Sequence, residues 1–145
     1  IPIPAIAEVQ VALQQAAAEA AESREVLKAR LRTGTVVSYA DRNWELNYKD
    51  ERKRLSQSRA IAVDMESACI ATQGFRMRVP YGVLLCVSDK PLHGEIKLPG
   101  QADKFYESAS GAHLQIGLKT IALLQEDVTA LHSRKLRSFD EPAFR

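Results

Sequence analysis

The sequence has no apolar run long enough to cross a membrane, and it has few of the residues that build metal sites. A transmembrane helix needs about 20 consecutive apolar residues, and no stretch of the 145 residues reaches that length. Only two cysteines and three histidines are present, and no paired CxxC motif occurs. These absences exclude a membrane-spanning protein and a disulfide-rich scaffold, and we expect no metal and no cofactor.

Charge of one sign is also lacking, because the formal net charge is only +2. A nucleic-acid-binding protein is expected to carry a clustered basic face. The short basic stretch Arg134-Lys135-Leu136-Arg137 is more typical of a surface or intersubunit ion pair. We therefore expect no nucleic-acid partner. The composition, 46% hydrophobic and 26% charged, is that of a soluble globular domain, and we expect a cytoplasmic protein.

The two cysteines, Cys69 and Cys86, lie among apolar neighbours. One bridge between them is possible, but reduced, buried thiols are more typical of a cytosolic protein. The opening Ile1-Pro2-Ile3-Pro4 has no basic region before it and does not resemble a signal peptide. We interpret it as the extended start of a chain entered in mid-course.

Hydrophobic spacing divides the rest of the chain into helices and strands. Helices are expected over residues 5–31, with a second helix starting near residue 22, and over residues 65–75 and 102–124. Strands are expected over residues 35–39, 60–63 and 79–87. Residues 44–55 are ambiguous, residues 91–100 are a predicted loop, and residues 132–145 are a polar tail.

Residues 79–87 form the most continuous apolar segment of the chain. A run without alternation indicates a strand buried on both faces, as in the middle of an α/β sheet. Strands alternating with helices predict an α/β domain, and ligands in such sheets gather at the carboxyl ends of the strands. Attention therefore falls on the residues that follow Val63 and Val87.

Two acidic groups stand at these points. Asp64-Met65-Glu66-Ser67 follows the second strand, where the start of a helix favours negative charge. A carboxylate there would accept hydrogen bonds from ligand hydroxyls. The same pattern is typical of an acidic helix N-cap and first turn, and on spacing alone that structural interpretation is favoured.

Ser88-Asp89-Lys90-Pro91 follows the third strand. Partial desolvation at the end of an apolar strand favours the protonated form of a carboxyl, which suits a general acid. Alternatively, Ser88 and Asp89 only begin a turn before the proline.

Taken together, the motifs resemble a known family. The segment 62–68, followed about twenty residues later by Cys86-Val87-Ser88-Asp89, resembles the paired signature of the nucleoside phosphorylase superfamily. Several further stretches resemble the AMP nucleosidase family within it: residues 1–4, 32–37, 41–46, 78–101, 131–137 and 141–142. The continuation Lys90-Pro91-Leu92-His93-Gly94-Glu95 separates this family from the phosphorylases. The likeness covers nearly the whole chain and is weakest over residues 12–28.

The resemblance implies hydrolysis of AMP to adenine and ribose 5-phosphate, with water as the nucleophile. It implies that Asp89 is the acid at the purine N7 and that Glu66 binds the ribose hydroxyls. Met65 would pack against the sugar, and Ser88 would orient Asp89. Asn43, Trp44 and Ser88 are candidates for the base region of the site, although a lone Trp is more often a core residue.

The resemblance also implies a partial nucleoside-phosphorylase-like fold with a mixed central sheet flanked by helices. Residues 1–145 would be the C-terminal part of the catalytic domain, without its N-terminal strands, phosphate-gripping groups and regulatory domain. Family members assemble as hexamers, so we expect a homo-oligomer. Two alternatives stay open: phosphorolysis of a nucleoside, and a non-catalytic remnant that supplies an assembly surface.

Overall fold

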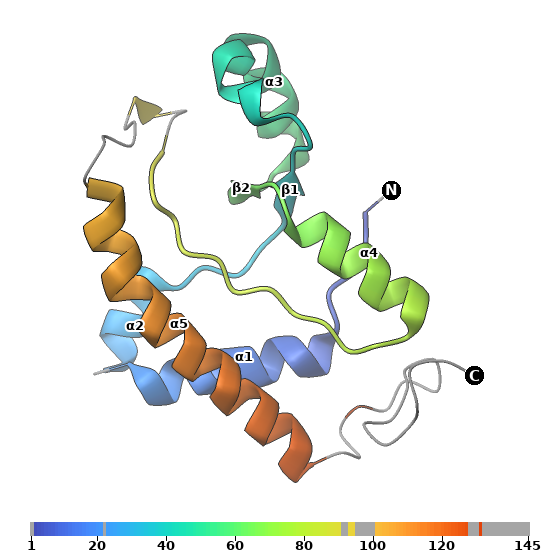
Figure 1. Cartoon of the computed structure of the whole chain (residues 1–145), viewed down its shortest axis with the longest axis vertical. Coiled ribbons are helices and arrows are strands. Elements are labelled where there is room, and N and C mark those ends of the chain that lie inside the picture. Colours follow the sequence, from blue (N-terminus) through green and yellow to red (C-terminus); the bar gives the residue numbers. More distant parts are fainter. Residues whose placement is uncertain (1, 22, 91–92, 95–100, 128–130, 132–145) are drawn as a thin grey trace.

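The computed structural model of the chain describes residues 2–21, 23–90, 93–94, 101–127 and 131. Its helices are α1 (Ala7–Ala20), α2 (Arg24–Arg30), α3 (Tyr48–Ser58), α4 (Ser67–Met77) and α5 (Gln101–Glu126), with a 3₁₀ helix, η1, at Arg42–Asn47. The strands β1 (Val36–Ser38) and β2 (Ala62–Asp64) form a parallel pair. Helices precede β1, separate β1 from β2 and follow β2, as Figure 1 shows.

The first predicted helical region is two helices, as the change in composition near residue 22 indicated. Helix α1 is rich in alanine, the best helix former. Ser23 is the N-cap of α2: its hydroxyl accepts the Val26 N–H at 3.2 Å, the usual contact of an N-cap serine. The ambiguous residues 44–55 fold as η1 and α3.

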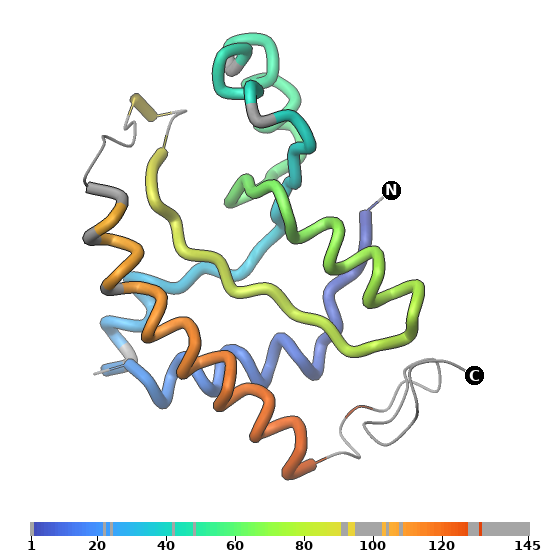
Figure 2. The backbone as a smooth tube through the Cα atoms, viewed as in Figure 1, coloured from blue at the N-terminus to red at the C-terminus, as the bar shows by residue number. Residues whose placement is uncertain are grey.

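The main core lies between α1 and α5, which are side by side in Figures 1 and 2. Val9, Ala12, Leu13 and Leu124 are buried there, with Ile116 and Leu123 packed against them. Glu19 on α1 and Lys119 on α5 also form an ion pair at 3.0 Å. Leu114, Leu118 and Ile121 are exposed on α5.

The prediction of a buried strand over residues 79–87 is wrong. The segment is extended but belongs to no strand, and it packs on the core formed by α1 and α5 instead of joining the sheet. Leu84 packs against the α1–α5 core, whereas Leu85 and Val87 are exposed. One side of the apolar segment therefore packs on the α1–α5 core, and its other side is exposed to solvent.

The cysteine prediction is wrong for burial, since Cys69 and Cys86 are both free and exposed. We expect both thiols to be alkylated by iodoacetamide in the native protein. Desolvation raises the pKa of the Cys86 thiol above its ordinary value, so its alkylation should need a higher pH than that of a free cysteine. Mass spectrometry of the two peptides across pH measures this; labelling that appears only in denaturant would contradict the exposure.

Gly82 allows the extended segment 79–87 to lie close to α1, because glycine has no side chain. A Cβ added at Gly82 would lie 2.5 Å from Val9 Cγ1 and 3.1 Å from Leu13 Cδ1, both in the core. We expect Gly82→Ala to lower the free energy of unfolding by about 1–3 kcal/mol through overpacking, measured by urea denaturation. Gly111→Ala is the control: its Cβ meets nothing within 4 Å on α5, so it should stabilise by about 0.5–1 kcal/mol. A Gly82→Ala protein as stable as the parent would refute this packing.

No helix in the described part of the chain is long and apolar enough to cross a membrane. Residues 91–92 and 95–100 of the predicted loop, including Pro91, Leu92, Glu95 and Lys97, lie outside the described residues, as does the tail after residue 131.

Candidate active site

The two strands end at the same edge of the sheet, because they are parallel. Val36 pairs with Ala62, Val37 with Val63 and Ser38 with Asp64. The Tyr39 N–H donates to the Asp64 carbonyl at 2.9 Å and continues the ladder by one residue. The side chains of Ser38 and Asp64 therefore meet at the carboxyl edge, where α/β sheets bind ligands.

Ser38, Asp64 and Ser67 form a hydrogen-bonded group, called here the Ser–Asp–Ser cluster. Asp64 Oδ1 accepts the Ser38 hydroxyl at 2.5 Å and the Ser67 hydroxyl at 2.8 Å. Asp64 Oδ2 accepts the Ser67 N–H at 2.7 Å. Ser67 is only 9% exposed. The cluster joins the ends of both strands to the first turn of α4.

Met65 and Glu66 form the turn between β2 and α4. Met65 is 39% exposed, and Glu66 is exposed too. Glu66 Oε2 accepts the Met65 N–H at 3.2 Å, and that carboxylate makes no other hydrogen bond or ion pair with the described residues. Most of its capacity to accept hydrogen bonds is thus available to a ligand.

Trp44 and Asn43 lie on η1, beside the end of β1. Trp44 is 9% exposed, and its ring stacks on Tyr39 with centroids 5.4 Å apart and an interplanar angle of 26°. Asn43 is exposed, and its N–H donates to Asp41 Oδ1 at 2.8 Å. Trp44 therefore supports Tyr39 from within the fold, whereas the side chain of Asn43 faces solvent.

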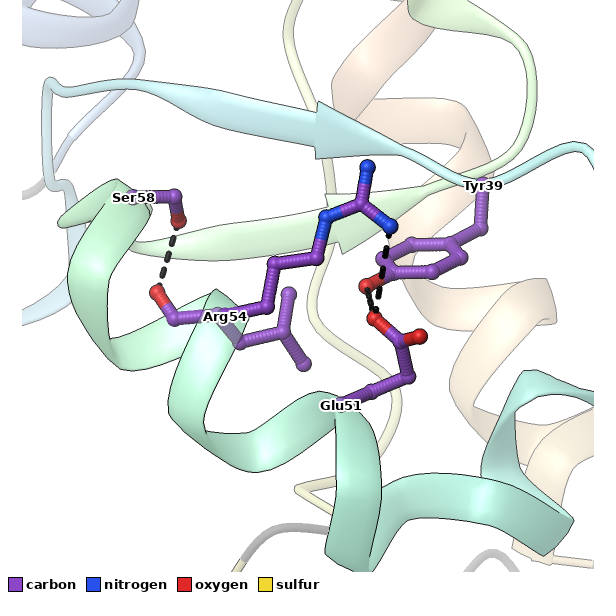
Figure 3. Close-up of polar contacts among 5 residues, drawn as sticks. Tyr39, Glu51, Arg54 and Ser58 are labelled. Carbon is purple, nitrogen blue, oxygen red and sulfur yellow. Dashed lines mark hydrogen bonds and ion pairs between the residues drawn. The ribbon is translucent and has the colours of Figure 1, made fainter.

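A depression of about 430 Å³ lies next to this edge, between β1 and α3. It is lined by Val37, Ser38, Tyr39, Ala40, Arg54, Leu55 and Ser58. Figure 3 shows the Tyr39 hydroxyl donating to Glu51, which also faces the Arg54 guanidinium at 3.8 Å. Desolvation and the Glu51 carboxylate raise the pKa of Tyr39. The phenol therefore stays protonated and acts as a hydrogen-bond donor at neutral pH.

Ser88 and Asp89 follow the extended segment 79–87. The Ser88 hydroxyl donates to Asp89 Oδ1. No hydrogen bond or ion pair within the described residues joins Asp89 to Glu66. The structure thus brings Met65, Glu66, Asn43 and Trp44 to the edge of the sheet, and Ser88 and Asp89 belong to a separate segment.

Sequence reasoning missed Ser38 and Tyr39. Ser38 is the last residue of β1, and Tyr39 follows it. Their position could have identified them, because parallel pairing places the residues at the end of β1 beside the residues that follow β2. Within the described residues, no group of three or more His, Cys, Asp or Glu side chains could hold a metal ion.

Comparison with known proteins places these features in a family. The family described as Phosphorylase superfamily matches residues 1–122. The chain is 63% identical over 146 aligned positions to the AMP nucleosidase of Escherichia coli (strain K12), and likewise to that of Escherichia coli O157:H7. Each match covers 100% of this chain but 30% of the relative. The predicted resemblance and the α/β class, seen here as a small parallel sheet flanked by helices, are both confirmed.

Proposed function

This chain belongs to the phosphorylase superfamily, and from that membership we propose that the protein hydrolyses AMP to adenine and ribose 5-phosphate. The observation that carries the proposal is the 63% identity to AMP nucleosidases across the whole chain. Because the chain spans 30% of the length of these relatives, the activity is proposed for the protein to which these residues belong.

Hydrolysis breaks the bond between C1′ of the ribose and N9 of the adenine. The bonding electrons leave with the adenine, and positive charge develops on the ribose. Glu66 accepts hydrogen bonds from the ribose hydroxyls, and its negative charge lies near the developing cation. Met65 packs against the sugar. The exposure of both side chains beside the sheet edge supports these roles.

Asp89 donates a proton at N7 of the departing adenine, so that the base leaves as a neutral molecule. The contact with the Ser88 hydroxyl supports an oriented carboxyl. The oxygen of a water molecule then bonds to C1′ and loses a proton to the solvent, completing ribose 5-phosphate. The stacked Tyr39 and Trp44 support a rigid wall next to the base, and Asn43 is a candidate polar contact for it.

We also propose that residues 1–145 form the C-terminal part of a catalytic domain in a cytoplasmic homo-oligomer. Exposed apolar side chains on α4, on residues 79–87 and on α5 support packing against further protein: Ile70, Phe75, Val79, Val87, Leu114, Leu118 and Ile121. Monomeric proteins rarely leave large contiguous apolar patches open to water.

Phosphorolysis is the second candidate, because the matched family carries the name of phosphorylases. The two reactions separate when the protein is incubated with AMP in phosphate-free buffer and adenine is followed by chromatography. We expect adenine and ribose 5-phosphate to form without added phosphate. Release that requires phosphate would favour phosphorolysis. No release under either condition, with assembly retained, would favour the non-catalytic alternative.

A further inference from the structure

The backbone on both sides of Met65 and Glu66 is fixed by hydrogen bonds. Before the turn, the Asp64 carbonyl accepts the Tyr39 N–H at 2.9 Å. After it, the Ser67 N–H is held by Asp64 Oδ2 at 2.7 Å. The Glu66 carbonyl accepts the N–H groups of Cys69 and Ile70 at 3.0 and 3.3 Å. The turn is therefore anchored at each end, while its two side chains remain exposed.

Ser38 connects this turn to the neighbouring strand. Its hydroxyl donates to Asp64 Oδ1 at 2.5 Å, and its oxygen accepts the Ala68 N–H at 3.0 Å. Ser38 Oγ also lies 2.9 Å from Ser67 Oγ. One small side chain from β1 thus contacts the last residue of β2 and the first turn of α4. A side chain satisfied on all sides in this way has little freedom to change rotamer.

A cluster of this kind is more than an ordinary helix cap needs. An N-cap side chain accepts one backbone N–H of the first turn. The N-cap residue of α4, Glu66, makes no such bond with its side chain, and Asp64 and Ser38 instead accept the N–H groups of Ser67 and Ala68. The hydroxyls of Ser38 and Ser67 add hydrogen bonds to Asp64. These bonds join β1, β2 and α4 next to Met65 and Glu66, the two residues that face solvent. Fixed geometry of this sort is what a ligand-binding carboxylate requires from the residues around it.

We propose that Ser38, Asp64 and Ser67 are positioning residues, which hold the Met65–Glu66 turn so that the Glu66 carboxylate meets the ribose hydroxyls of the substrate. This inference rests on the proposed hydrolysis of AMP and assigns the cluster to sugar recognition within it. The cluster contacts no substrate atom itself. It acts through Glu66, so its effect is largest for substrates that offer Glu66 both the 2′- and the 3′-hydroxyl.

The test compares kcat/KM for AMP and for 2′-deoxy-AMP in the parent and in Ser38→Ala. We expect the preference of the parent for AMP to fall by about tenfold in Ser38→Ala, since small misplacements of a positioned group have effects of this size. The rate with 2′-deoxy-AMP should change much less. Ser38→Thr keeps the hydroxyl in a strand that favours β-branched residues and should restore the preference.

Ser56→Ala is the matched control, because Ser56 is exposed on α3 and its hydroxyl makes no hydrogen bond with the described residues; it should leave both rates unchanged. If circular dichroism shows that Ser38→Ala does not fold, Ser67→Ala is used as the second variant. It removes the bond from the Ser67 hydroxyl to Asp64 but keeps the bond from the Ser67 N–H.

The outcomes separate the two proposals. Equal losses with AMP and 2′-deoxy-AMP in a folded variant would mean that the cluster only stabilises the fold, and the positioning role would be overturned while AMP hydrolysis stood. A parent protein that releases no adenine from AMP would overturn the proposed function, and the positioning role with it.

Discussion

Asp89→Asn is expected to lower kcat for adenine release from AMP by about 10²–10⁴-fold, the usual contribution of a positioned general acid. An asparagine side chain can donate a hydrogen bond to N7 but cannot transfer a proton to it. The adenine must then leave with negative charge that nothing neutralises. The bond from Ser88 goes to a carboxylate oxygen, which the side-chain amide oxygen can replace, so the fold should be unaffected. Steady-state kinetics with chromatographic detection of adenine measures the change.

Asp50→Asn makes the same chemical change on the exposed face of α3 and should leave kcat unaltered. Thermal unfolding of both variants shows whether either has lost stability. If Asp89→Asn retains nearly full activity in a folded protein, Asp89 is not the acid. The alternative that Asp89 only helps to begin a turn before the proline is then favoured.

Glu66→Gln is expected to reduce kcat/KM for AMP by about 10- to 100-fold. A hydrogen bond to a charged group contributes about 1.5–3 kcal/mol, and the loss of negative charge also removes stabilisation from the positively charged ribose of the transition state. Because the charge acts in the transition state, a good part of the loss should appear in kcat. Initial rates over a range of AMP concentrations separate kcat from KM.

The control for this substitution is Glu107→Gln on α5, an exposed position that should change neither constant. A Glu66→Gln protein with the kcat and KM of the parent would remove Glu66 from the site. A rise in KM alone would keep it as a binding residue but would exclude a special role in the transition state.

Sequence patterns predicted the part of the fold that positions Glu66. A short β-branched run predicted β1 and a short apolar run predicted β2, and the acidic residues after the second run directed attention to residues 64–66. The prediction held because these signals are local: two adjacent strands pair in parallel, and a helix follows at once. The family resemblance added the substrate class, which no spacing of residues could indicate.

Residues 79–87 show where such reasoning fails. A continuous apolar run indicates that a segment will be covered, but it does not state by what. Here α1 and α5 cover one side through Leu84, the sheet is not involved, and the expected burial of Cys86 fails for the same reason. Whether a segment joins a sheet depends on neighbours distant in sequence, and the nine residues themselves carry no information about those neighbours.

Ser38 was missed for a different reason. A serine that ends a short strand is unremarkable alone, and its importance appears only when the register sets it opposite Asp64. The pairing of β1 with β2 was not read from the sequence at the level of individual residues. Contacts between residues 26 and 30 positions apart, as from Ser38 to Asp64 and Ala68, thus remained invisible until the structure was described.

One bound nucleotide should be contacted by two carboxyl groups, with Glu66 at its sugar and Asp89 at its purine. A crystal structure of the protein with an AMP analogue whose C1′ is joined to the base through carbon, which cannot be hydrolysed, tests this directly. We expect Glu66 oxygens within about 2.5–3.2 Å of the ribose hydroxyls and the Asp89 carboxyl within the same range of N7. An analogue bound elsewhere, or with either carboxyl turned away from it, would contradict the account.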